Sequence, residues 1–194
     1  NLLQRCGFNS NGVFVIDGSR RSSHGNAYFS GFGKNKRIVF FDTLLESLND
    51  DELEAVLAHE LGHFKRKHII KGMLLSIVTS LLGLWILSWL MQNDWFYHSL
   101  GVSTESTYMA LLLFTMVIPV FTFLLSPLLS MLSRKNEFEA DEFAAEQTDA
   151  SNLIQALVNM YKENASTLTP DPLYSAFYDS PPPAPVRVAH LASR

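Results

Sequence analysis

The sequence has a single cysteine and almost no charge in its centre. Because Cys6 is alone among 194 residues, the chain has neither a disulfide framework nor a metal site built from thiolates. The formal net charge of −4 gives no indication of nucleic-acid binding. No lysine or arginine occurs between Lys71 and Arg134, and the acids in that stretch are Asp94 and Glu105. The distribution of charge therefore separates two polar ends from an apolar centre.

The start of the chain lacks both a methionine and a signal-peptide pattern. Because the sequence opens on Asn1, we expect a fragment whose N-terminal part is missing. No internal repeat is present. The length is sufficient for one good core, or for one domain with appendages.

Two long uncharged blocks occupy the centre. Met73 to Met91 is a run of 19 such residues, which at about 1.5 Å per residue crosses a bilayer core of about 30 Å. Thr107 to Ser133 is a run of 27 and contains Pro119 and Pro127, which membrane helices tolerate. The blocks predict a transmembrane helical hairpin. The alternative is a pair of buried helices in a large soluble core.

Basic residues flank the hairpin on both outer sides. These residues are Lys65, Arg66, Lys67 and Lys71 before it, and Arg134 and Lys135 after it. The connecting loop, Gln92 to Ser106, has none. The positive-inside rule therefore places both outer ends in the cytoplasm, and we predict a multi-pass integral membrane protein.

The segment His59-Glu60-Leu61-Gly62-His63 lies in a predicted helix from about Asp50 through Lys71, with Asn49 and Asp50 as N-cap candidates. Two histidines four residues apart lie on one helix face, close enough to share one Zn²⁺. Glu60 points to the same region. The pattern indicates a zinc-activated water with Glu60 as general base; the alternative is a chance match.

Three extended runs precede this helix: Val13 to Asp17, Asn26 to Phe32 and Lys36 to Asp42. The last two predict a hairpin around the turn signal Gly33-Lys34-Asn35. The strand segment formed by Asn26, Ala27, Tyr28 and Phe29 is the candidate for holding a peptide through main-chain hydrogen bonds. An internal strand without a substrate role is the alternative.

Two histidines leave a catalytic zinc site one protein ligand short. After the second block, Asn136 to Gln147 predicts a polar helix on the same side of the membrane as the motif helix. Its acids Glu137, Glu139, Asp141 and Glu142 are all ligand candidates. Glu137 is the preferred candidate, and Asp141, one turn further on, is placed to accept a histidine ring N–H.

The rest of the chain predicts less regular structure. We expect a short connection at 43–48, an amphipathic helix at Asn152 to Glu163 capped by Asp149 or Ser151, a proline-rich loop at 164–185 and a last helix at Val186 to Ser193. His68 and His190 are expected to be exposed.

Four segments together resemble one family. They are Ser23 to Gly31, Arg37 to Leu45, the zinc motif, and Ser133 to Asp141. In this order they resemble the integral-membrane zinc endopeptidases of the CAAX prenyl protease type 1 family. The resemblance implies that His59, His63 and Glu137 bind zinc, with Glu60 as base and Asp141 behind the ligands. It further implies that the Asn26 to Phe29 strand lies along the substrate, and that the chain is the C-terminal part of a protein with about seven membrane helices.

One departure from the family concerns the C-terminal proline run. When the sequences are aligned on Arg187, Pro181 stands where the family has a histidine and Val186 where it has a glutamate. The resemblance implies that this histidine contacts the reacting carbonyl, so its loss would cost about a few kcal/mol of transition-state stabilisation while leaving zinc binding intact. Arg187 is a candidate structural or substrate-carboxylate contact, although an arginine beside a proline run is more often a surface residue.

The sequence therefore predicts a mainly α integral-membrane protein with a small β-sheet. Its expected parts are 1–72 (hairpin and motif helix), 73–133 (membrane hairpin) and 134–194 (Glu-ligand helix and the rest of the peptidase domain). We expect one Zn²⁺ per chain and hydrolysis of peptide bonds at the cytoplasmic side. Two substrates are open from the sequence: a prenylated C-terminus, as the family resemblance implies, and a misfolded membrane protein. The alternatives are a bacterial heat-shock-type quality-control protease and a non-proteolytic zinc-binding scaffold.

Overall fold

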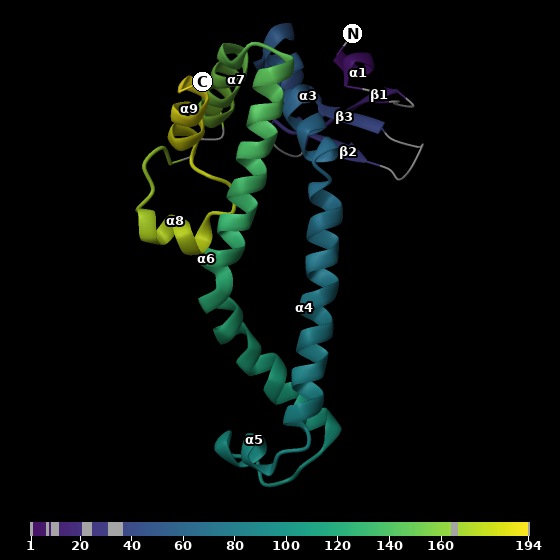
Figure 1. The fold of residues 1–194 in the computed structure, drawn as a ribbon, viewed down its shortest axis with the longest axis vertical. Coiled ribbons are helices and arrows are strands. Elements are labelled where there is room, and N and C mark those ends of the chain that lie inside the picture. Colours follow the sequence, from purple (N-terminus) through teal and green to yellow (C-terminus); the bar gives the residue numbers. More distant parts are fainter. Residues whose placement is uncertain are drawn as a thin grey trace. The chain divides into compact units, whose positions relative to one another are not determined.

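The computed structural model describes residues 2–6, 8, 12–20, 25–30, 37–163 and 167–193. The chain divides into two compact units, Asn1–Lys67 with Ser130–Arg194 (unit 1) and His68–Leu129 (unit 2). The predicted fold, mainly helical with one small sheet, is confirmed (Figure 1). Unit 1 contains α1 (Leu2–Arg5), β1 (Val13–Ile16), β2 (Ala27–Ser30), β3 (Arg37–Phe41), α2 (Asp42–Ser47), α3 (Asp50–Lys65), the end of α6 (Thr107–Gln147), α7 (Ala150–Glu163), α8 (Pro172–Tyr178) and α9 (Ala184–Ala192). Unit 2 contains α4 (His68–Leu90), α5 (Asp94–Ser99) and the start of α6.

The sheet has the strand order β1-β3-β2. β2 pairs antiparallel with β3, with Ala27 opposite Phe40, so the predicted pairing of these two runs is confirmed. The turn signal at 33–35 lies outside the described residues. β1 pairs parallel with β3 on the other side. Because β3 is central, β2 lies at an edge of the sheet.

The core of unit 1 lies between the sheet, α3, α7 and α9. Ile38 and Phe40 of β3 and Leu44 of α2 are buried there with Leu61 of α3 and Leu153 of α7. The predicted amphipathic helix is confirmed as α7, and Asp149 is its cap, because the Asp149 carboxylate accepts the Ser151 N–H at 2.8 Å. This packing fixes the motif helix against the segments that follow the apolar blocks.

In unit 2, α4 and α6 are long and apolar enough to cross a membrane, and their most apolar windows are only 6% and 11% buried. α6 continues without interruption through Pro119 and Pro127. Pro127 has no N–H to donate to the Phe123 carbonyl, and the Ser126 hydroxyl donates to that oxygen at 2.7 Å instead. A side-chain donor thus replaces the missing backbone donor, as membrane helices require.

Several boundaries differ from the sequence predictions. The motif helix, expected to reach Lys71, ends at Lys65, because Lys67 adopts a left-handed conformation (φ 58°) and α4 begins at His68. The expected connection at 43–48 is largely helix α2, and the expected loops contain α5 and α8. These helices have only six or seven residues, too few to show a helical period.

Candidate metal centre

The motif helix α3 begins with a reciprocal cap. The Asn49 side chain accepts the Glu52 N–H at 2.9 Å, and the Glu52 carboxylate accepts the Asn49 N–H at 3.1 Å. Three acids in the first turn add favourable charge at the positive end of the helix dipole. The helix buries Ala55, Ala58 and Leu61 in the core. This packing fixes the rotation of α3 about its axis.

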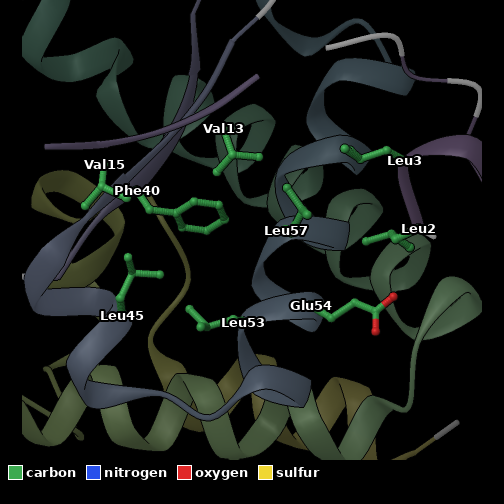
Figure 2. Close-up of a pocket in the computed structure, with 9 residues that line it drawn as sticks. All are labelled: Leu2, Leu3, Val13, Val15, Phe40, Leu45, Leu53, Glu54 and Leu57. Carbon is green, nitrogen blue, oxygen red and sulfur yellow. The ribbon is translucent and has the colours of Figure 1, made fainter. Parts of the chain in front are cut away.

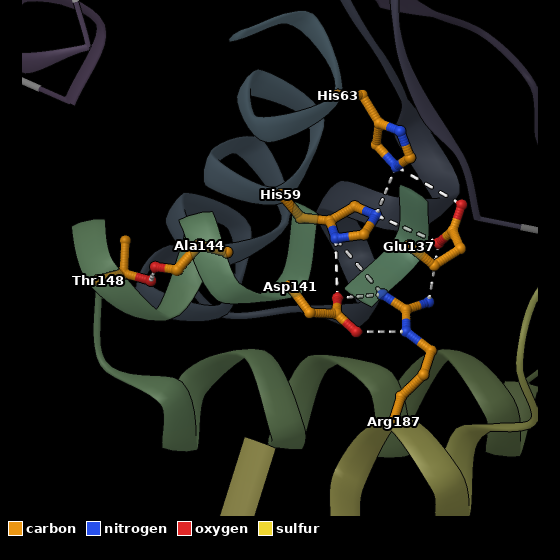
Figure 3. Close-up of polar contacts among 7 residues, drawn as sticks. All are labelled: His59, His63, Glu137, Asp141, Ala144, Thr148 and Arg187. Atoms are coloured by element: carbon orange, nitrogen blue, oxygen red, sulfur yellow. Dashed lines mark hydrogen bonds and ion pairs between the residues drawn. The ribbon is translucent and has the colours of Figure 1, made fainter. Parts of the chain in front are cut away.

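The two histidines lie one helical turn apart on the same face of α3, as the spacing predicts. Their Nε2 atoms are 3.2 Å apart, and the rings meet edge to face. His59 is buried, whereas His63 is about a quarter exposed. Both Nε2 atoms point toward Glu137 (Figure 3).

Gly62 allows α6 to approach these histidines. A Cβ on Gly62 would lie 2.9 Å from Ala140 Cα, which is closer than such contacts ever occur. Only a residue without a side chain therefore permits α3 and the end of α6 to pack at this distance. The sequence reasoning missed this role; the available signal was a glycine within a predicted helix.

The close packing brings Glu137 to the two histidines. Its carboxylate oxygens lie 3.6 Å from His59 Nε2 and 3.5 Å from His63 Nε2, and one ligand atom from each residue lies within 4.8 Å of the others. Tetrahedral zinc with ligands at about 2.0–2.1 Å separates its ligand atoms by roughly 3.4 Å. The three side chains therefore fit a zinc ion.

The other acids of this helix lie elsewhere. Glu139 is 3.9 Å from Lys135, and Glu142 is 3.3 Å from His190. His190 is half-buried and His68 is buried, so the expectation that both are exposed is wrong. Of the four acids considered from the sequence, Glu137 is the one placed between the histidines.

Asp141 lies behind His59, as its spacing from Glu137 predicts. This carboxylate is fully buried and lies 2.9 Å from His59 Nδ1. His59 donates its Nδ1 proton to Asp141 in this arrangement, which leaves the Nε2 lone pair directed at the cluster. A fixed tautomer of this kind is what a metal-binding imidazole needs.

Arg187 is a buried member of the same cluster, not a surface residue. Its Nε donates to Asp141 Oδ2 at 2.8 Å and its Nη2 to Oδ1 at 2.5 Å, and Nη1 lies 3.6 Å from Glu137 Oε2 (Figure 3). The surface alternative is wrong because α9 packs its Arg187 face inward, which no local pattern indicates. These contacts give Arg187 a structural role in the cluster.

Burial and charge act in opposite directions on the ionisable groups. Burial alone would raise the pKa of Asp141, but hydrogen bonds from Arg187 and His59 outweigh it and hold that pKa below its usual value. Burial likewise opposes the charge on Arg187, and Asp141 overcomes it, so the pKa of Arg187 is raised. The two groups therefore form a buried ionised pair.

Glu60 differs from Asp141 in the direction in which its pKa moves. Burial raises the pKa of Glu60 and is the largest effect; the charge of His59 lowers this pKa, that of Glu137 raises it and that of Arg187 lowers it, and the net result is a raised pKa. A carboxylate with a raised pKa is a better proton acceptor near neutral pH than an ordinary glutamate. Glu60 is thus electrostatically suited to the role of base.

Glu60 shares one cavity with the histidine and glutamate cluster. The cavity has a volume of about 210 Å³. Its lining consists of Val56, His59, Glu60, His63, Glu137, Leu153, Leu157, Met160 and Arg187. A larger cavity of about 370 Å³ faces Leu53 and Leu57 of α3, but its lining is apolar except for Glu54 (Figure 2). Reactive side chains converge on the smaller cavity.

The predicted substrate strand lies beside the motif helix. The Asn26 carbonyl accepts the Phe41 N–H at 2.9 Å, Ala27 is buried, and Tyr28 is partly exposed with its ring against Phe41. Phe29 follows in the same strand. The strand order places β2 at an edge of the sheet.

The segment carrying Pro181 is attached at both ends, to α6 and to α7. Arg134 Nη2 donates to the Ser175 carbonyl at 2.7 Å and to the Asp179 carbonyl at 3.3 Å, closing the end of α8. The Ala184 N–H donates to the Tyr161 hydroxyl at 3.0 Å, at the start of α9. Pro181 is exposed between these two attachments.

Two histidines from a His-Glu-x-x-His helix and a glutamate from a second helix form the donor set of zinc metallopeptidases. The family model of peptidase family M48 matches residues 1–194, and the chain belongs to this family. The predicted resemblance to CAAX prenyl proteases is also confirmed.

Several relatives show this likeness. CAAX prenyl protease 1 of Saccharomyces cerevisiae is 37% identical over 207 residues, which cover 98% of this chain and 46% of that protein. The homolog of Arabidopsis thaliana is 41% identical over 88% of this chain and 41% of its own length. The crystal structure of S. mikatae Ste24p matches with a TM-score of 0.88 at 35% identity, covering 98% of this chain and 48% of that one. The chain therefore spans about half the length of these relatives.

Proposed function

We propose that the protein is a membrane-embedded zinc endopeptidase that cleaves prenylated C-terminal peptides. The observation that carries this proposal is the convergence of His59, His63, Glu137 and Glu60 on one cavity. The relatives named CAAX prenyl protease 1 supply the substrate class.

Each residue of the cluster has a distinct task in this proposal. His59, His63 and Glu137 would hold one zinc ion, and Asp141 keeps the Nδ1 proton of His59 in place. When bound, the ion would supply Lewis acidity toward a peptide carbonyl and a water molecule. The Glu60 carboxylate accepts a proton from that water and delivers it to the departing amine.

The edge of β2 is proposed to hold the substrate. An extended peptide that adds to this edge forms main-chain hydrogen bonds, which do not depend on its side chains. Asn26 through Phe29 would lie along it. Arg187 is fully engaged with Asp141 and Glu137, so we assign it to holding the site rather than to the substrate carboxylate.

We infer that α4 and α6 cross the membrane with both outer ends in the cytoplasm. The support is their length and apolar surface together with the basic residues found outside the hairpin and absent within it. The active site would then face the cytoplasm.

The decisive experiment compares the wild type with Glu60→Gln on a farnesylated peptide and on the same peptide without the lipid. We expect the variant to retain its zinc content, measured by elemental analysis, and to lose about 10²–10⁴-fold in cleavage rate. Cleavage at the wild-type rate would remove Glu60 from the mechanism. A wild type that binds zinc and cleaves no faster than the variant would instead support the scaffold alternative.

A further inference from the structure

The turn between α4 and α6 has an unusual hydrogen-bonding pattern at the end of α4. The last carbonyls of an α-helix have no partner within the helix and normally bond to water. Here side chains reach back to them: Gln92 Nε2 donates to the Ser88 carbonyl at 3.0 Å, and Asn93 Nδ2 to the Trp89 carbonyl at 2.6 Å.

The neighbouring carbonyls are satisfied as well. The backbone N–H groups of Met91 and Asn93 donate to Leu87 and Leu90 at 2.9 and 3.1 Å. The Tyr97 hydroxyl donates to the Met91 carbonyl at 3.3 Å. All five carbonyls from Leu87 to Met91 therefore have a partner within the protein. Such completeness is expected where water is scarce, and it is unnecessary in bulk solvent.

The aromatic residues of this turn separate into an inner and an outer set. Phe96 and Tyr97 of α5 are buried against Leu87, Ala110 and Leu113. Trp95 points outward and is 52% exposed, with its ring centroid 6.0 Å from that of Trp89. Trp85 and Trp89 of α4 are 68% and 53% exposed. We call Trp85, Trp89 and Trp95 the tryptophan face.

The tryptophan face continues the exposed apolar surface of α4. Tryptophan is enriched where a membrane helix leaves the hydrocarbon, because its ring is apolar and its N–H can bond to headgroups. The adjacent charges, Asp94 and Glu105, are both acidic, and no lysine or arginine lies between Lys71 and Arg134. This turn therefore has no electrostatic attraction to anionic lipid.

We infer that the tryptophan face binds the headgroup boundary of neutral, zwitterionic phospholipid, with α5 lying in that boundary as an anchor for the hairpin. This inference rests on the proposed membrane crossing of α4. The anchor fixes the depth at which α4 ends, and Trp85 lies deeper than Trp89 by about 6 Å for a helix along the membrane normal.

The chain has three tryptophans, all in this face, so its tryptophan fluorescence reports on it alone. The test uses Trp85→Phe/Trp89→Phe, which keeps Trp95, and Trp89→Phe/Trp95→Phe, which keeps Trp85. Each full-chain variant is reconstituted in phosphatidylcholine vesicles that carry bromine either near the headgroup or near the bilayer centre.

We expect Trp95 to emit at a blue-shifted wavelength and to be quenched most by shallow bromine, and Trp85 to be quenched more by deep bromine than Trp95 is. If Trp85 is quenched by brominated lipid while Trp95 is quenched only by aqueous iodide, the hairpin spans the membrane, but the inference that α5 anchors it at the headgroup boundary is wrong. If neither is quenched by lipid, the membrane crossing is wrong too. Stronger quenching of Trp95 in anionic vesicles would overturn the choice of neutral lipid.

If a double variant does not reconstitute, the difference spectrum between the wild type and Trp95→Phe isolates the Trp95 signal. A difference spectrum that is blue-shifted and sensitive to shallow bromine supports the anchor, and one that matches free tryptophan in water overturns it.

Discussion

Unit 1 places charged side chains inside, and unit 2 places apolar side chains outside. Asp141 and Arg187 are 0% and 9% exposed in unit 1, whereas residues such as Leu84 and Met116 are largely exposed in unit 2. Both arrangements obey one rule, namely that polar groups away from water must be paired. In unit 1 the pairing is between charges, and in unit 2 it is between side-chain donors and backbone carbonyls. The following substitutions test this contrast.

The largest effect is expected at the ligand cluster of unit 1. Glu137→Gln removes the negative charge of the carboxylate that lies between the two imidazoles. We expect zinc affinity to fall by more than the roughly 10- to 100-fold that is lost when a residue behind a metal ligand is replaced. Zinc titration by calorimetry measures this. Glu139→Gln, on the same helix, is the control and should bind zinc as the wild type does; the reverse result would show that the third ligand is misassigned.

The second largest effect is expected at the buried ion pair between Asp141 and Arg187. Arg187→Met leaves Asp141 charged and buried without its partner, which should cost about 3–5 kcal/mol of unfolding free energy. For a chain of this size the Tm falls by on the order of 10 °C. The control is Arg20→Met, which breaks the exposed Asp17–Arg20 pair (2.7 Å) and should change the Tm little.

A double variant separates charge from packing at this pair. Asp141→Asn combined with Arg187→Met removes both charges, so the loss should be smaller than for Arg187→Met alone. An equal or larger loss would mean that packing of the arginine stem, rather than its charge, stabilises α9.

Glycine substitutions should act differently in the two units. Gly62→Ala forces a methyl group against the Ala140 backbone, and we expect a loss of about 1–3 kcal/mol with a weakened zinc site. Gly72→Ala in α4 meets no atom within 4 Å and gains helix propensity, so it should not lower the Tm. Similar Tm values for the two variants would contradict the close approach of α3 and α6.

The smallest effect is expected from a hydroxyl in unit 2. Ser126→Ala removes the donor that serves the Phe123 carbonyl at Pro127, and it should cost about 0.6 kcal/mol, typical of side-chain hydrogen bonds in membranes. Thr79→Ala is the control, because the Leu75 carbonyl that Thr79 bonds has no proline opposite it. The two variants are compared by thermal unfolding in the same detergent. A larger loss of stability for Thr79→Ala would contradict the role of the Ser126 hydroxyl as a replacement donor at Pro127.

The sequence predicted features that depend on local periodicity. The shared face of His59 and His63 follows from the 3.6-residue repeat, and the pairing of β2 with β3 follows from adjacent extended runs. The placement of Glu137 required an assumption about the apolar hairpin, because 74 positions separate it from His63 (137 − 63). The structure places these residues together in unit 1.

Features set by tertiary packing could not be predicted. The burial of Arg187 depends on which face α9 turns toward α6, and the parallel pairing of β1 with β3 depends on a crossover with no sequence signal. α8 is a different case. Asp171 followed by Pro172 is a recognisable helix start, and the density of prolines around it concealed that signal.

The Arg187 contact makes α9 part of the candidate metal centre. A stop codon just before Ala184 would leave both histidines, Glu60 and Glu137 in place, yet it would strip the counter-charge from Asp141 and loosen the imidazole that Asp141 orients. Loss of residues 184–194 would therefore damage the candidate metal centre, although it removes none of the candidate ligands and leaves Glu60 in place.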